Sequence, residues 1–278
     1  MVGILRRLAW FLLLLAPLVA PGGPDGALLR VGVFGQDPPR SFLDHNGSLA
    51  GLDIDVARAL CQAIGAECEL VPVDWDSLIA GLVEGRFHFV VASISITDAR
   101  RERIGFTRPY YNTPGRFIAR RGRFQAINPE TATGLRIGVR RGTTFDKYVT
   151  DNLSAGKEII RYSTQPDALV DLRLGRLDLV LGDHMVLDRT FLSTRSGADF
   201  ELVGGPVADA RWFGYGNGIA LPKGAVDLRD QLDRAVADIH ANGVFDAIQT
   251  KWIGYDVRDL TGDLQRKAEA AAIGAGNP

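Results

Sequence analysis

Short apolar runs alternate with segments of helical periodicity from the start of the globular part of the chain. Residues 29–34 (LRVGVF), 69–73 and 87–92 (FHFVVA) are apolar runs of strand length. Residues 53–64 and 75–84 carry apolar side chains at helical spacing between them. This alternation predicts βαβ units built on a mostly parallel sheet.

The same pattern restarts after about residue 115 and predicts a second α/β core. The strands expected there are 116–119, 136–139 (RIGV) and 177–181 (LDLVL), and the helices are 166–174 and one that begins near Phe145. A third section after about residue 205 predicts a strand at 218–221 and helices at 227–242 and 243–252. The fold class is therefore α/β with two cores.

Both ends of the chain depart from this pattern. Arg6 and Arg7 precede an apolar run over residues 8–20, which is typical of a secretory signal, and we expect residues 1–22 to form one. The run has about 13 residues, whereas a membrane span needs roughly 20, so an anchor helix is the weaker alternative. Residues 268–278 lack a regular apolar face, and we expect residues 262–278 to form a disordered tail.

Export would place the two cysteines in an oxidising compartment, where a disulfide can form. Cys61 lies on the helical pattern 53–64, and Cys68 opens the next strand pattern. A helix–turn–strand step can bring the two Cα atoms within bridging reach, and an oxidising compartment favours a disulfide over two free buried thiols.

The charge balance and the spacing of the histidines argue against a nucleic-acid-binding protein and against a metal site. The chain has 32 Lys+Arg against 33 Asp+Glu, a balance that argues against nucleic-acid binding, which needs a basic face. The four histidines are scattered without ligand spacing, so no metal site is expected. We expect no cofactor.

Polar residues follow the apolar strands at the sheet edge where α/β proteins bind ligands. Ser93 and Ser95 come after FVVA, Thr97 is a good helix N-cap, and Arg100 follows on the first turn. Two hydroxyls, backbone N–H groups and a forked guanidinium would together suit a carboxylate. A capped surface helix with a solvated arginine is the alternative.

Four further residues follow apolar strands in the same way. Thr143 and Thr144 open a helix after RIGV and offer N–H and hydroxyl donors to an anion, although any capped helix can look like this. Asp183 ends the strand LVLGD and would pair with an ammonium or merely cap the next helix. Trp75 would stack on a ligand or belong to the core.

The motifs together resemble a known family. The runs GSLAGLDIDVARALC, VPVDWDSLIAGLVEGRFHFVVASISITDARRERIGFTRPYY, LRIGVRRGTT, LVDLRLGRLDLVLGD and DIHANGVFDAIQTKWIG occur in the family's order over about residues 29–255. They resemble the periplasmic polar amino-acid-binding proteins of ABC importers, extracellular solute-binding protein family 3. The resemblance implies a type II periplasmic-binding-protein fold with two lobes, two hinge strands and a cleft between the lobes. Lobe 1 would comprise 29–113 plus 211–260, and lobe 2 would comprise 114–210.

The resemblance also implies roles for the first lobe. Arg100 matches the arginine that clamps the ligand α-carboxylate, and Ser93 and Ser95 match positions on the binding strand. Trp75 matches an aromatic side chain that covers the ligand side chain.

In the second lobe, Thr143 and Thr144 match the loop that binds the carboxylate, and Asp183 matches the acid that pairs with the α-ammonium. The pair Cys61 and Cys68 matches a disulfide of some members.

The side-chain pocket departs from the family pattern. Phe34 stands where members that bind basic amino acids often carry Asp, and Asp37 stands where an aromatic residue is common. Arg140 replaces an apolar residue, and Arg40 stands where Phe is usual. Arg140 would favour a carboxylate or amide side chain, whereas Asp37 would oppose this or simply pair with Arg140. These departures leave the identity of the amino acid open.

The expected function is that of a monomeric periplasmic protein that closes on an amino acid and delivers it to an inner-membrane ABC permease. One alternative is a cyclohexadienyl dehydratase-like enzyme on the same fold, which turnover of prephenate or arogenate would reveal. Another is a component that presents its ligand to a sensor kinase, which a neighbouring kinase gene would favour over a permease gene.

Overall fold

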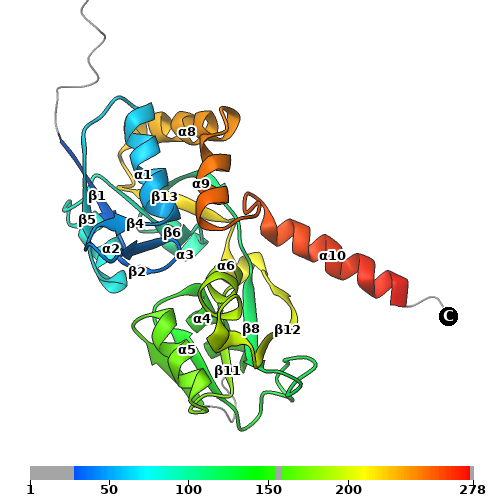
Figure 1. The fold of residues 1–278 in the computed structure, drawn as a ribbon. Helices are drawn as coiled ribbons and strands as arrows, with labels where there is room; N and C mark the ends of the chain where they lie inside the picture. Colours follow the sequence, from blue (N-terminus) through cyan, green and yellow to red (C-terminus); the bar gives the residue numbers. More distant parts are fainter. Residues whose placement is uncertain (1–27, 154–157, 276–278) are drawn as a thin grey trace, which may run out of the picture.

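Two separate five-stranded sheets form the centres of two lobes (Figure 1). The structure, a computed structural model, describes residues 28–153 and 158–275. The expected signal, residues 1–22, lies outside them. Between the sheets the chain crosses at residues 112–114 and again at residues 208–216. The predicted two-lobed α/β class is therefore confirmed.

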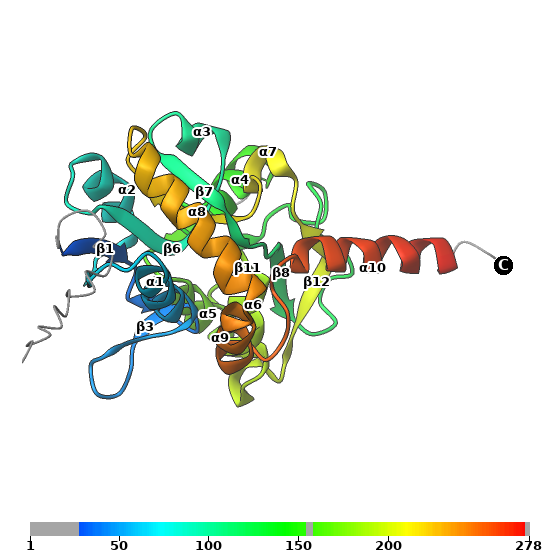
Figure 2. The same cartoon turned by 90° about the horizontal axis from the view of Figure 1, so that it is seen from above.

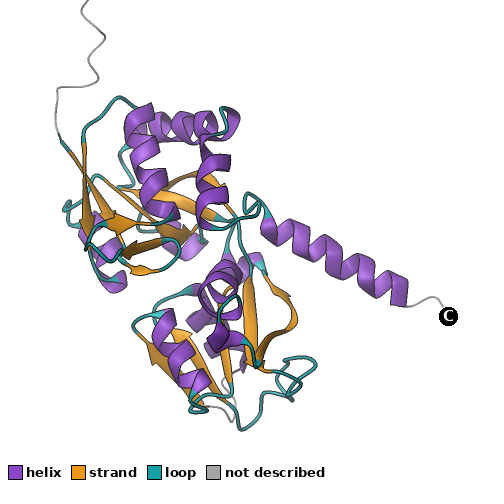
Figure 3. Cartoon of the chain, in the orientation of Figure 1, coloured by secondary structure: helices purple, strands orange, loops and turns teal. Residues whose placement is uncertain are grey.

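The first sheet has the strand order β5 (Cys68–Pro72), β1 (Leu29–Val33), β6 (Phe89–Ser95), β13 (Asn217–Leu221) and β7 (Gly105–Tyr111). β1 pairs in parallel with β5 and β6, while β13 runs antiparallel to β6 and β7. The helices of this lobe are α1 (Leu52–Ala63), α2 (Trp75–Val83), α3 (Asp98–Arg101), α8 (Val226–Ala241) and α9 (Val244–Trp252). Figure 3 shows these helices around the strands.

The second sheet has the order β10 (Glu158–Tyr162), β9 (Arg136–Arg140), β11 (Leu179–Asp183), β8 (Gly115–Arg120) and β12 (Phe200–Val207). β9 pairs in parallel with β10 and β11, and β8 is antiparallel to both of its neighbours. The helices here are α4 (Thr144–Leu153), α5 (Gln165–Arg173) and α6 (His184–Leu187), with a π-helical turn Asp188–Leu192 and a 3₁₀ turn Arg195–Gly197. The short helix α7 (Ala210–Phe213) lies in the second crossing segment and packs against α4.

A small antiparallel sheet follows β1 and brings charged residues towards the second lobe. It consists of β2 (Gln36–Asp37), β3 (Ser41–Leu43) and β4 (Leu49–Ala50). Asp37 and Arg40 are buried at 3% exposure each, so this excursion delivers two charged side chains to the interior.

Burial of the central strands explains why the apolar runs become strands. Residues 89–94 of β6 are all buried, as a parallel strand covered on both faces requires. On one face, α1 packs against this strand, and α8 packs against α1 and β7, so that Leu60 and Val236 belong to one buried apolar cluster with the strand. The polar residue Ser95 comes at the end of the strand, where the sheet opens towards the second lobe.

The expected disordered tail is wrong over the described part of residues 262–278. Helix α10 runs from Leu260 to Ala275 and projects away from both lobes (Figures 1 and 2). The run contains five Ala and one each of Gln, Arg, Lys and Glu, residues that favour a helix without needing an apolar face. Its first turn is held at the crossing, since the amide of Thr261 donates to the carbonyl of Asn112 over 3.2 Å.

None of the helices within the described ranges combines the length and the apolar character that a membrane span needs.

The predicted disulfide between Cys61 and Cys68 is confirmed. It joins α1 to β5 with the two Cα atoms 6.2 Å apart. The bridge therefore closes the helix–turn–strand step at the edge of the first sheet.

The double variant Cys61→Ala/Cys68→Ala should lower the free energy of unfolding by about 2–3 kcal/mol, because the short loop is no longer constrained in the unfolded chain. Urea denaturation of the oxidised protein and the variant measures this. Reductant should destabilise the wild type and leave the variant unchanged. Equal stabilities of the oxidised wild type and the variant would contradict the prediction.

Candidate functional site

A cavity of about 280 Å³ lies between the two lobes, and both lobes line it. This volume is close to the lower end of ligand pockets, about 300–1,000 Å³, so the cavity suits a small molecule. Eight of the residues singled out in the sequence line it: Trp75, Ser93, Ser95, Arg100, Arg140, Thr143, Thr144 and Asp183. The structure thus brings together residues that lie more than 100 positions apart.

The first lobe presents Arg100 to this cavity through a helix cap. After β6 ends at Ser95, the hydroxyl of Thr97 accepts a hydrogen bond from the amide of Arg100 and caps α3. The side chain then turns back, and its Nη1 donates to the carbonyl of Ser95 over 3.0 Å. The short helix therefore positions the guanidinium beside the end of the strand.

Arg100 shares its surroundings with a second guanidinium. Its Cζ lies 5.7 Å from the centroid of the Trp75 ring, and the Cζ of Arg140 lies 4.2 Å from a Trp75 ring centroid. Burial, and after it the charge of Arg140, lower the pKa of Arg100 to about 10. Arg100 therefore stays charged at neutral pH, next to a group of the same sign.

The second lobe contributes the start of α4. Arg140 ends β9, and the hydroxyl of Thr143 donates to its carbonyl over 2.7 Å. The same hydroxyl accepts from the amide of Asp146 at 3.3 Å. Thr143 therefore fixes the turn, while the buried Thr144 begins the helix and also lines the cavity.

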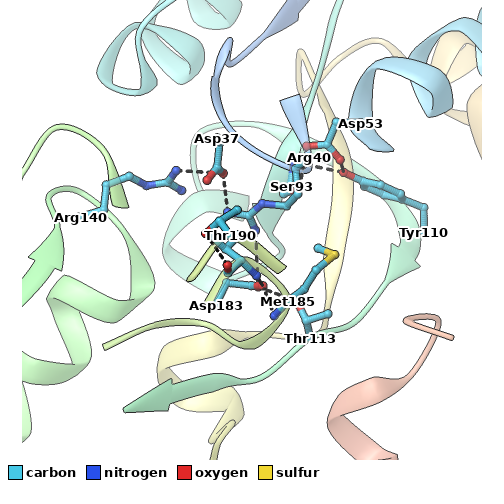
Figure 4. Close-up of polar contacts among 11 residues, drawn as sticks. Asp37, Arg40, Asp53, Ser93, Tyr110, Thr113, Arg140, Asp183, Met185 and Thr190 are labelled. Atoms are coloured by element: carbon cyan, nitrogen blue, oxygen red, sulfur yellow. Dashed lines mark hydrogen bonds and ion pairs between the residues drawn. The ribbon is translucent and has the colours of Figure 1, made fainter. Parts of the chain in front are cut away.

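Asp183 faces Arg100's lobe from the end of β11, and its oxygens are already engaged. Its Oδ1 accepts from the amides of Met185 and Val186, at 2.9 and 3.3 Å, which caps α6. The hydroxyl of Thr113 donates to its Oδ2 over 2.6 Å. The Nη1 of Arg40 lies 3.4 Å from the same oxygen (Figure 4). Asp183 therefore caps α6, and within the described residues its ion-pair partner is Arg40.

Asp37 is the centre of a buried ion-pair cluster that joins the lobes (Figure 4). Its Oδ2 pairs with Nη2 of Arg40 and, at 3.1 Å, with Nη1 of Arg140 from the second lobe. Burial alone would raise the pKa of Asp37, but the two arginines lower it below its usual value. Of the two roles considered for Asp37, the structure has the pairing with Arg140.

Phe34 and Trp75 hold Arg140 in place. The two rings meet edge to face with centroids 6.0 Å apart, and the Cζ of Arg140 lies 5.2 Å from the Phe34 centroid. Cation–π attraction favours a guanidinium in this position. The aromatic surface expected to cover a ligand side chain is therefore covered, at least partly, by the chain's own Arg140.

Arg40 is the main residue that the sequence prediction left out of the site. Its position after two prolines marked it as unusual, but not as a bridge between two carboxylates. Further residues of the cavity wall were also missed: Asn112, Thr113, Phe145, Ala208, Phe213, Gly214, Tyr215, Gly216, Asn217, Thr261 and Gln265. Many of them lie in the crossing segments, and no local motif marks them.

Ser93 is tied to a carboxyl group behind the cavity wall. Its hydroxyl donates to Asp53 Oδ2 and the hydroxyl of Tyr110 donates to Oδ1, both over 2.6 Å (Figure 4). The backbone of Ser93 has the left-handed value φ 53°, and its amide donates to the Tyr110 oxygen. The Ser93 hydroxyl therefore helps to order this part of β6 and is not reserved for a ligand.

Burial raises the pKa of Asp53 to about 6, although the charge of Arg40 and the hydrogen bonds from Ser93 and Tyr110 pull it down. The folded protein therefore binds this proton more strongly than the unfolded chain, whose ordinary value is 3.8.

No group of three His, Cys, Asp or Glu side chains within residues 28–153 and 158–275 is arranged to hold a metal ion.

Asp53→Asn should change how stability depends on pH. In the wild type, the favourable contribution of protonated Asp53 is complete below about pH 4 and is lost as the pH rises through about 6. Relative to the wild type, the variant should gain up to about 3 kcal/mol between pH 4 and pH 7, at roughly 1.4 kcal/mol per pKa unit. Urea denaturation across this range measures the difference, and a difference that does not vary with pH would contradict it.

Comparison with known proteins agrees with this architecture. Residues 29–255 match the bacterial extracellular solute-binding proteins, family 3. The L-arginine-binding protein of Pseudomonas aeruginosa is 38% identical over 232 residues, which cover 82% of this chain and 89% of that protein.

Solved structures give the same result. An ancestral arginine-binding protein bound to glutamine has a TM-score of 0.73 at 30% identity, over 84% of this chain and 100% of that one. An ancestral amino acid-binding protein described as a precursor of cyclohexadienyl dehydratase has a TM-score of 0.71 at 25% identity, over 81% of this chain and 95% of that one. The chain belongs to family 3 of the bacterial extracellular solute-binding proteins.

Proposed function

We propose that this protein captures an amino acid in the cleft between its lobes, in the periplasm, and presents it to an ABC permease in the inner membrane. The observation that carries the proposal is the state of Arg100. It is buried enough to have a lowered pKa, it lines the cavity, and within the described residues it makes no ion pair. A guanidinium held in this way is an anchor for a carboxylate.

The donors around Arg100 suit the α-carboxylate of an amino acid. Ser95 belongs to the same lobe, and Thr143 and Thr144 lie at the start of α4 on the other lobe. A carboxylate on Arg100 would meet the hydroxyls of Ser95 and Thr144, together with the positive end of the α4 dipole, while Thr143 already donates its hydroxyl proton to the Arg140 carbonyl. Asp183 would accept the α-ammonium, in place of the 3.4 Å contact with Arg40.

A ligand that binds both lobes at once would favour the closed form. Two contacts already cross the mouth of the cleft: Arg141 pairs with Asp76 at 2.7 Å, and Trp75 Nε1 donates to the Gly142 carbonyl at 3.4 Å. A ligand shifts the population by its differential affinity, and a shift from 1:99 to 99:1 needs about 5.5 kcal/mol. Two charge-assisted contacts made only in the closed cleft are of that size. Closure is the signal that we expect the permease to recognise.

The names of the relatives support the amino-acid class. The Pseudomonas aeruginosa relative binds L-arginine, and the ancestral structure holds glutamine. From these names we infer only that the ligand of this protein carries an α-amino-acid head group. Because the side-chain end of this cleft has its own charges, the identity of the amino acid does not transfer with it.

Binding is favoured over the dehydratase alternative by the carboxyl groups of the cleft. Elimination of water from prephenate would need a protonated acid near neutral pH. Arg40 and Arg140 keep the pKa of Asp37 low despite its burial, and Asp183 accepts two amide N–H bonds, a hydroxyl and a guanidinium. Asp37 is therefore not suited to donate a proton, and the oxygens of Asp183 are occupied by hydrogen-bond donors.

Arg100→Ala should lower the affinity for the bound amino acid at least about 100-fold, because truncating one side of a buried charge pair costs about 2–5 kcal/mol. A thermal-shift screen of the twenty amino acids identifies the ligand, since a ligand at 100 times its Kd adds about 2.7 kcal/mol of stability. Calorimetry on the wild type and the variant then measures the loss.

Arg86→Ala is the matched control. Arg86 is exposed after α2, pairs with Glu84 and does not line the cavity between the lobes, so its removal should leave the affinity unchanged. If Arg100→Ala retained the wild-type affinity with an unchanged fold by circular dichroism, Arg100 would not be the carboxylate anchor. If none of the twenty amino acids bound to the wild type, the proposed function would be wrong.

A further inference from the structure

The charged groups of the cleft do not balance. Three guanidinium groups face the cavity, those of Arg40, Arg100 and Arg140. Two carboxylates lie with them, Asp183 in the cavity wall and Asp37 in contact with Arg40 and Arg140. Among the groups that line or touch the cavity, guanidinium groups therefore outnumber carboxylates by one.

The two carboxylates offer one unengaged oxygen to a cation that enters the cleft, since Asp37 Oδ1 is buried and has no hydrogen-bond partner within the described residues. Asp37 is shared by two guanidinium groups, and Asp183 by Arg40, Thr113 and the cap of α6. The face of Trp75, where a ligand cation would gain cation–π attraction, has the Arg140 guanidinium 4.2 Å from a ring centroid. A basic ligand side chain would have to displace Arg140 or lie beside it.

An anionic group, in contrast, would find donors in place. The Nε atoms of Arg40 and Arg140 are buried and have no hydrogen-bond partner within the part of the chain that the structure describes. Arg140 is 5% exposed. Within the described residues its side chain donates one hydrogen bond, from Nη1 to Asp37 Oδ2. Buried donors without partners cost free energy, and a carboxylate can accept from two of them at once.

We propose that the ligand is an amino acid with a second carboxylate, of the glutamate or aspartate class, and that Arg140 together with Arg40 binds this second carboxylate. The inference rests on the proposed function and names the ligand class of the same cleft.

Counting charges over the occupied cleft shows why this class fits. The α-carboxylate takes Arg100, and the ammonium takes Asp183 in place of the long contact with Arg40. The second carboxylate then faces the Arg40 nitrogen released from Asp183 and the open edge of Arg140. With Asp37 and Asp183, four negative groups meet four positive ones. A neutral amino acid leaves one positive charge over, and arginine or lysine leaves two, in a site where like charges are poorly screened.

Asp53 lies behind the cavity wall, where its carboxyl accepts hydrogen bonds from Ser93 and Tyr110, and it does not line the cavity. Its charge acts on Arg40, and an ionised Asp53 lowers the positive excess by one for every ligand. The inference therefore rests on the groups that a ligand side chain would touch, the guanidinium groups of Arg40 and Arg140 and the Trp75 face that Arg140 covers. The pair Arg141–Asp76 at the mouth is neutral as a unit.

The test is calorimetry of the mature protein with L-glutamate, L-aspartate, L-glutamine, L-arginine, L-lysine and L-histidine, with succinate as a probe that lacks the amino group. We expect glutamate or aspartate to bind at least tenfold more tightly than glutamine and at least 100-fold more tightly than arginine or lysine. If a basic or neutral amino acid binds best, the proposed function stands and the inference is overturned. If succinate binds and no amino acid does, the proposed function fails. If nothing binds, both fail.

Arg140→Gln tests the residue assignment. The preference for glutamate over glutamine should fall at least tenfold, because the amide cannot supply the charge that the second carboxylate needs. Arg173→Gln makes the same change in net charge on an exposed position of α5 in the same lobe and should leave the preference unchanged. Asp37 keeps Arg40 in the variant, so the fold should persist, which a thermal melt checks. An unaltered preference in a folded Arg140→Gln protein would overturn the assignment to Arg140.

Discussion

The buried carboxylate of Asp37 is the interaction on which the geometry of the cleft depends. It lies on the small sheet beside the first lobe, and it binds Arg40 from its own lobe and Arg140 from the other. Burying any one of these charges alone would be costly, and each is tolerated because the others are present. The lobes therefore meet through a charged contact inside the cleft, and not only through the crossing segments.

This contact also determines what the aromatic residues can do. Phe34 and Trp75 form a surface that would accept a flat or cationic group, but Arg140 is drawn onto it by Asp37 and by the rings themselves. The cleft thus supplies its own cation at a place where a ligand could have brought one. A preference for anions follows from occupied space as much as from net charge.

Much of the fold was predictable because its signals are local. The strand β6 is an unbroken apolar run, and helices such as α1 and α8 have clear apolar faces, so periodicity alone places them. β7 and β12 escaped prediction because they contain Pro109 and the pair Gly204–Gly205, which interrupt the strand pattern. Their pairing with β13 and β8 overrides the local sequence, and such long-range pairing leaves no local mark. The helix α10 was missed for the opposite reason, since its propensity is local but its sequence has no apolar stripe.

The residues of the site likewise divide into those that the local sequence marks and those that it does not. Arg100, Thr143 and Asp183 sit where a strand ends and a helix begins, and that junction can be recognised in sequence because caps and strand ends have characteristic residues. Arg40 acts from the turn between β2 and β3, where it pairs with Asp37 three residues before it and with Asp183 of the other lobe, so only the folded structure connects the two carboxylates. In the proposed complex, the α-amino and α-carboxyl groups of the ligand bind where strands end and helices begin, and its side chain binds the charged residues of the loops. Recognition of the common head group then depends on elements that define the fold. The side-chain preference can then change by a few substitutions such as those at residues 37, 40 and 140. A relative of 38% identity can therefore share the cleft and the head-group contacts without sharing the ligand.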